Sequence, residues 1–115
     1  MKLRTMGYGL AIILGVAVVL SPGLNAQSGD AAAGKAIYTK SCASCHGATG
    51  GPKAALAKAL KVEMRHLGAK EVLAKSDADL RKDVIEGTGK MKPVKNLSDQ
   101  DVSNVIAYMR GFQAP

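Results

Sequence analysis

The chain has 115 residues, with no tryptophan and a single phenylalanine, and its 16 lysine and arginine residues outnumber 9 aspartate and glutamate residues for a formal net charge of +7. A chain of this length makes one small domain. The lysines are scattered and have no interleaved aromatic side chains for base stacking, which argues against a nucleic-acid-binding protein.

The first 26 residues have the order of a secretory signal peptide. Two basic residues come first, an uncharged run follows from Met6 to Leu20, and Ala26 supplies a small residue for cleavage. The uncharged run is shorter than the roughly 20 residues of a membrane span. We therefore predict a signal peptide over 1–26, export to the periplasm and a mature domain over 27–115. The alternative is an uncleaved N-terminal anchor.

The first half of the mature domain predicts two helices separated by a loop. Asp30 can cap a helix that reaches Cys42, because apolar or small residues follow it at spacings of three and four. Three glycines and a proline make 47–52 a loop. The stretch 54–62, rich in alanine and leucine, is a strong helix former.

The second half predicts three further helical segments. A short one covers 71–75, and two others begin at Ser76 and Ser98, each of which starts an S-x-x-D cap motif. Gly87 and Gly111 are expected to end these two helices. No segment alternates between apolar and polar residues at period two, so the predicted fold class is all-α, with four or five short helices.

The block Cys42-Ala43-Ser44-Cys45-His46 is the attachment signature of a c-type haem. The two thiols, Cys42 and Cys45, can form thioethers with the two vinyl groups of one porphyrin, and the imidazole of His46 is then held where it can bind the iron. The mature domain has only 115 − 26 = 89 residues. A chain so short is marginally stable without a disulfide bond, a metal or a cofactor. A covalent haem would supply the apolar bulk that the sequence lacks.

A C-x-x-C motif also occurs in other classes of site. A thiol–disulfide redox site expects a βαβ context, which the sequence does not predict. A C-x-x-C motif can also supply two of the ligands of a zinc site, but such a site needs further ligands at suitable spacing. Only His66 remains to provide one.

The sixth ligand of a haem iron is sought among the methionines of the mature domain. Met109 lies on the apolar stripe of the last predicted helix, so core packing explains it, while Met64 could be core or surface. Met91 lies in the loop G-T-G-K-M-K-P, where no helical stripe accounts for a methionine. We predict His46 and Met91 as the axial pair, with His66 as the rival sixth ligand.

A histidine that binds a metal usually donates its other ring N–H to a fixed acceptor. Pro52 is the only proline between His46 and Met91. Its carbonyl oxygen is the candidate acceptor, and a plain turn proline is the alternative.

With these motifs in place, the mature chain resembles a small bacterial class I cytochrome c, a monohaem protein. The resemblance covers nearly all of the mature chain. It rests on Gly34 and Tyr38 before the C-x-x-C-H-G motif and on the G-K-M run that ends at Met91. It also rests on L-S-D at 97–99, followed by I-A-Y-M-R at 106–110. It implies a helical fold in which the first and last helices cross, with Gly34 allowing close approach and Tyr38 and Tyr108 near the contact. It also implies His46 and Met91 as axial ligands.

The chain departs from that family in two respects. Lys92 separates Met91 from Pro93, where relatives commonly have methionine followed directly by proline. The tryptophan that many relatives place near a haem propionate is absent, so Lys53 and Lys95 are candidate propionate partners.

The sequence thus predicts a one-electron carrier rather than an enzyme, with one covalent haem c whose iron cycles between Fe(III) and Fe(II). The mature domain has a charge of 14 − 9 = +5, which suits docking to donor and acceptor redox proteins with acidic faces. We expect a monomer that meets the membrane only through partners or an uncleaved signal. The alternatives are a haem c subunit of a larger membrane or periplasmic oxidoreductase complex, and a haem protein with an open sixth site.

Overall fold

A computed structural model describes residues 28–115, so the predicted signal peptide lies outside the described residues. Within this part the helices are α1 (Ala31–Ser41), α2 (Ala43–His46), α3 (Ala54–Leu60), α4 (Lys70–Leu73), α5 (Asp77–Glu86) and α6 (Asp99–Met109). The described part contains one isolated β-bridge and no strand, and the predicted all-α fold is confirmed. None of the helices between residues 28 and 115 has the length and apolar character to span a membrane.

The predicted helix caps are present. The carboxylate of Asp30 accepts hydrogen bonds from two backbone N–H groups in the first turn of α1, at 2.8 and 3.2 Å. The hydroxyl of Ser76 accepts one from the backbone three residues on, at 3.1 Å. Ser98 and Asp101 form a reciprocal capping box at the start of α6. These starts are determined by contacts within four residues, which is why the sequence reveals them.

Three details differ from the prediction. α3 ends at Leu60 instead of Val62, because Lys61 adopts the left-handed conformation with φ of 55°. α4 ends at Leu73, two residues earlier than expected. The helices exceed the four or five expected because Cys42, with φ of −122° and ψ of −38°, interrupts the first helix and the chain resumes as α2.

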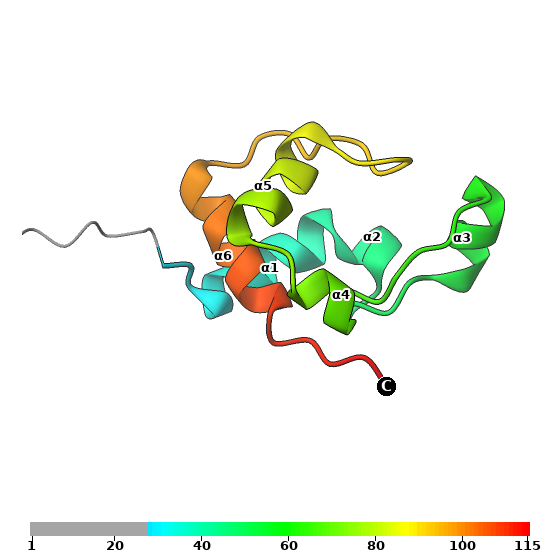
Figure 1. Cartoon of the computed structure of the whole chain (residues 1–115). Helices are drawn as coiled ribbons and strands as arrows, with labels where there is room; N and C mark the ends of the chain where they lie inside the picture. The colour runs from blue at the N-terminus through cyan, green and yellow to red at the C-terminus, as the bar shows by residue number, and fades with distance from the viewer. Residues whose placement is uncertain (1–27) are drawn as a thin grey trace, which may run out of the picture.

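α1 and α6 pack directly against each other (Figure 1). A Cβ atom added to Gly34 would lie 1.9 Å from the carbonyl oxygen of Asn104, so only glycine permits this approach. The contact is also tied by the backbone N–H of Asp30, which donates to Oδ1 of Asn104 at 2.8 Å. The predicted packing of the first helix on the last, and the role of Gly34 in it, are confirmed.

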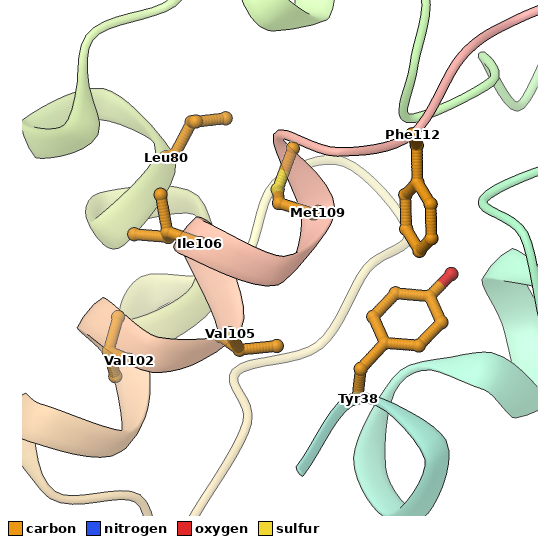
Figure 2. Packing of buried hydrophobic residues seen from close by; sticks show 7 residues of the cluster. All are labelled: Tyr38, Leu80, Val102, Val105, Ile106, Met109 and Phe112. Carbon is orange, nitrogen blue, oxygen red and sulfur yellow. The ribbon is translucent and has the colours of Figure 1, made fainter. Parts of the chain in front are cut away.

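The buried core centres on α6, with Leu80 to one side of this helix and Tyr38 to the other (Figure 2). Its members are Tyr38, Leu80, Val102, Val105, Ile106, Met109 and Phe112. The rings of Tyr38, Tyr108 and Phe112 meet at angles, with centroids 5.0 to 5.4 Å apart. Met109 is a core residue, as its position on the apolar stripe predicts, and both tyrosines lie at the contact between the terminal helices.

Arg110 joins the end of α6 to the turn between α4 and α5. Its guanidinium donates to the carbonyl oxygens of Leu73 and Lys75, at 3.0 and 2.9 Å, and bonds the carboxylate of Asp77. These bonds hold the segment before α5 against the core, and α5 in turn carries one wall of the site described next.

Candidate functional site

The C-x-x-C-H segment begins where α1 ends. Cys42 is half-buried and Cys45, in α2, is exposed. Burial raises the pKa of the Cys42 thiol to about 11, and the neighbouring Cys45 adds to the rise. The thiol is therefore protonated at neutral pH, which is the opposite of the depressed pKa that activates a thiol–disulfide redox site.

Tyr38 holds this segment in place from the core. Its hydroxyl donates to the carbonyl oxygen of Gly47 at 2.7 Å and lies 3.3 Å from that of His46. Burial, followed by the proximity of Cys42 and Tyr108, raises the pKa of Tyr38 to about 12, so the hydroxyl keeps its proton. Sequence reasoning placed Tyr38 only at the helix contact; its position one helical turn before the motif was the available signal.

His46 is half-buried, and one of its ring nitrogens is inaccessible to solvent. Its Nδ1 has no hydrogen-bond partner among the described residues. Burial lowers the pKa of the imidazole, so the ring is neutral at pH 7, the form that binds metals. A buried polar atom without a partner is rare in folded proteins and marks a place where a further group belongs.

The predicted hydrogen bond from His46 to the carbonyl of Pro52 is absent from this structure. The loop around Pro52 is fixed by other contacts instead. The backbone N–H of Lys53 donates to the carbonyl of Cys45 at 3.3 Å, and that of Leu67 donates to the carbonyl of Gly50 at 2.9 Å. These two backbone hydrogen bonds fix the conformation of the loop, and Nδ1 of His46 takes part in neither of them.

A mostly apolar pocket with a volume of about 200 Å³ opens beside His46. Its walls come from α1, α2, the segment 65–75, α5, the loop after α5, and α6. Cys42, His46 and Met91 all line it. The core residues that share its walls are Tyr38, Leu80, Val105, Ile106 and Met109. An apolar pocket with a few convergent polar groups is the usual form of a cofactor site.

Met91 reaches the pocket from a tight turn. The backbone groups of Thr88 and Met91 bond one another at 3.0 and 2.9 Å, and Gly89 between them has φ of 55°. The N–H of Val94 donates to the carbonyl of Val84 at 2.9 Å and ties the loop back to α5. Met91 lines the pocket even though Lys92 precedes the proline.

His66 does not line the pocket. Its Nδ1 accepts a hydrogen bond from the backbone N–H of Gly68 at 2.9 Å, and its ring lies against Gly51. Met64 is likewise absent from the pocket wall. The structure therefore brings Met91, and neither of these two, to the pocket of His46. No group of three or more metal-binding side chains gathers within 28–115, so the further ligands of a zinc site are missing there.

Three charged side chains interrupt the apolar wall: Arg65, Lys75 and Asp83. Lys75 and Asp83 form an ion pair with side chains 40% and 27% exposed, while Arg65 pairs with Glu71 at 3.0 Å. The lysines suggested by sequence, Lys53 and Lys95, are not on this wall. Nothing in the linear pattern distinguishes Arg65 or Lys75 from other basic residues, because only tertiary packing brings them to the pocket.

Comparison with known proteins agrees with this geometry. The family model described as "Cytochrome C oxidase, cbb3-type, subunit III" matches residues 29–109. Cytochrome c-555 of Chlorobaculum tepidum is 38% identical over 111 residues, which cover 88% of this chain and 92% of that protein. Cytochrome c-554(547) of Halothiobacillus neapolitanus is 37% identical, covering 71% of this chain and 96% of its own. The solved structure titled KustC0563 c-type cytochrome superposes with a TM-score of 0.61 at 31% identity, covering 70% of this chain and 98% of that one.

Proposed function

Because the chain belongs to the family of small c-type cytochromes, we propose that it is a periplasmic one-electron carrier with His46 and Met91 as the axial ligands of its haem iron. As a member of this family it carries covalent haem c, transfers electrons with redox partners and is not an enzyme. Beyond what family membership gives, we propose His46 and Met91 as the axial ligands and the periplasm as the location. The observation that carries it is that His46, Met91 and Cys42 line one apolar pocket.

The residues present fit a covalent haem. Cys42 and Cys45 are free thiols at the spacing of the attachment motif, and the Nδ1 of His46 is buried without a partner. In this proposal the two cysteines form the thioethers, and the neutral imidazole of His46 and the thioether of Met91 bind the iron. When bound, the haem supplies an iron that alternates between Fe(III) and Fe(II).

The chain's own residues have three further tasks in this proposal. The apolar walls exclude water from the ligand pair, which contributes to setting the reduction potential. Tyr38 fixes the backbone that follows the attachment motif. Arg65 and Lys75 are the cationic side chains on the wall, and each would bind a haem propionate by exchanging its present carboxylate partner, Glu71 or Asp83.

The test uses the full chain, produced together with haem-maturation machinery. The colour should survive acid–acetone extraction, and the near-infrared charge-transfer band of a methionine-bound Fe(III) should be present. Met91→Ala should remove that band, while the matched variants Met64→Ala and His66→Ala should keep it. Colour lost on extraction would contradict covalent attachment, and a band lost only in His66→Ala would contradict the ligand assignment.

Export and association are tested separately. The order of residues 1–26 supports a periplasmic location, so the mature protein should appear in the periplasmic fraction and begin after Ala26. Its positive charge supports partners with acidic faces, and sedimentation of the purified protein should report a monomer.

A second candidate is a haem c subunit of a larger oxidoreductase complex. The family model that matches residues 29–109 is described as an oxidase subunit, which favours this candidate. The 38% identity to cytochrome c-555 of Chlorobaculum tepidum favours the carrier. Stable co-purification with a membrane oxidase through gel filtration would decide for the complex.

A further inference from the structure

The loop that brings Met91 to the pocket is itself largely exposed. Thr88, Gly89, Lys90 and Lys92 are all exposed, while Met91 is half-buried. In Figure 1 the loop extends from the end of α5 as a narrow hairpin. The two backbone bonds between Thr88 and Met91 close the turn upon itself. The position of Met91 relative to the pocket is therefore set where the loop joins the rest of the fold.

One of these joints is Gly87, the residue at which α5 ends. Its backbone N–H donates to the carbonyl of Asp83 at 3.0 Å, and its φ of 80° and ψ of 168° lie in a region that essentially only glycine adopts. α5 is itself fixed to the core, because Leu80 is buried and the guanidinium of Arg81 donates to the hydroxyl of Ser103 in α6 at 2.6 Å. Gly87 therefore sets the direction in which the chain leaves a fixed helix.

The returning arm of the loop lies directly against Gly87. A Cβ atom added there would lie 2.5 Å from the carbonyl oxygen of Met91, 2.9 Å from Cδ of Pro93 and 3.0 Å from its nitrogen. These are backbone and ring atoms, which cannot swing aside as the tip of a flexible side chain can. The N–H of Val94 closes the loop just beyond them by donating to the carbonyl of Val84 at 2.9 Å. The backbone of Met91 can thus approach α5 this closely only because residue 87 has no side chain.

Gly89 differs from Gly87 although it lies in the same loop. It too has a positive φ, of 55°. A Cβ atom added to it would meet nothing within 4 Å. Gly89 therefore serves the turn alone, whereas Gly87 also makes room for the backbone of Met91.

We propose that Gly87 is a positioning residue that holds Met91 at the sixth coordination position of the haem iron and so keeps that position closed to external ligands. This inference rests on the proposed function and deepens it by naming what keeps the methionine in place. A side chain at residue 87 would push the backbone of Met91 away from α5. The fraction of molecules with an open sixth position would then rise, and an external ligand would bind with a lower apparent Kd.

The experiment titrates imidazole into the haem-loaded Fe(III) protein and records the near-infrared band of methionine-bound iron. Gly87→Ala should lose most of this band in the absence of imidazole, and its apparent Kd for imidazole should fall by about tenfold or more. Met91→Ala gives the value for a fully open position. Unchanged band and affinity in Gly87→Ala would overturn the proposal.

Two control variants separate positioning from general effects. Gly89→Ala changes a glycine of the same loop that has open space around it, and its Kd should stay within about threefold of the wild-type value. Gly34→Ala introduces a clash between α1 and α6, outside the loop, and should lower stability while the methionine band persists. A gain in imidazole affinity in either control equal to that of Gly87→Ala would show that flexibility or lost stability is the cause, and would overturn the proposal.

Pro93→Ala provides a second test if Gly87→Ala does not fold. It removes the ring that faces Gly87 and frees the backbone after Met91, so the apparent Kd for imidazole should fall by about threefold. An unchanged Kd would count against the proposal. A wild type without the methionine band, or a Met91→Ala protein with wild-type imidazole affinity, would refute the ligand assignment as well, whereas a normal wild type insensitive to changes at residues 87 and 93 would refute only the role of Gly87.

Discussion

Gly34→Ala is expected to destabilise the protein although it improves the intrinsic helix propensity of α1. Alanine in place of glycine within a helix is worth about 1 kcal/mol. The new Cβ would lie 1.9 Å from the carbonyl oxygen of Asn104, so α1 and α6 must separate by about 1 Å or more. Such overpacking costs about 1–3 kcal/mol, and the separation also weakens the bond between Asp30 and Asn104, worth about 1 kcal/mol. The net loss expected in the free energy of unfolding is about 2 kcal/mol.

The assay is urea unfolding of the haem-loaded protein, followed by circular dichroism at 222 nm, with thermal melts alongside. A loss of about 2 kcal/mol corresponds to a fall of about 8–16 °C in Tm for a domain of this size. Ala36→Gly, on the exposed side of the same helix, is the control and should cost only the propensity difference of about 1 kcal/mol. A Gly34→Ala protein as stable as the wild type would refute the close approach of the two helices.

Three further predictions concern stability. Tyr38→Phe should cost about 1–2 kcal/mol in urea unfolding, because the carbonyl of Gly47 loses its hydrogen bond; a change below about 0.5 kcal/mol would show that the hydroxyl does not hold this loop. Ser98→Ala should cost about 1 kcal/mol through loss of the α6 cap, while Ser28→Ala, before the first helix, should be neutral. Hydrogen bonds from the backbone and side chain of Ser98 lower the pKa of Asp101 below 3.8. The folded state therefore binds fewer protons than the unfolded state in that range, and the stability contributed by the carboxylate is present above pH 3.8 and lost as the pH falls below it. The stability difference between wild type and Asp101→Asn should shrink in melts as the pH falls below 3.8; a constant difference would contradict the role of the carboxylate in the cap.

Much of the helical framework follows from local sequence. Asp30, Ser76 and Ser98 start helices because a short polar side chain satisfies backbone N–H groups two or three residues away. The C-x-x-C-H motif likewise indicates haem attachment from five adjacent residues. The loop position of Met91 was informative because Gly87 and Gly89 come shortly before it and no helical stripe explains it.

Other features of the site could not be predicted from the sequence. Arg65 and Lys75 resemble every other basic residue of the chain until packing places them on the pocket wall. The hydroxyl of Tyr38 bonds the carbonyl of Gly47, nine residues away, although the sequence placed Tyr38 only at the contact between the terminal helices. The hydrogen bond expected from His46 to the carbonyl of Pro52 is not formed among the described residues, where Nδ1 of His46 has no partner.

The sequence by itself determined the cofactor chemistry, the helical class and the helix starts, because each depends on residues within about four positions of one another. Only the tertiary structure decided which side chains share the pocket with His46. That depends on the close contact of α1 with α6 at Gly34, and on α5 held beside them by Arg110. These contacts join residues 37 to 74 positions apart, and long-range packing of this kind leaves no periodic signal in the chain.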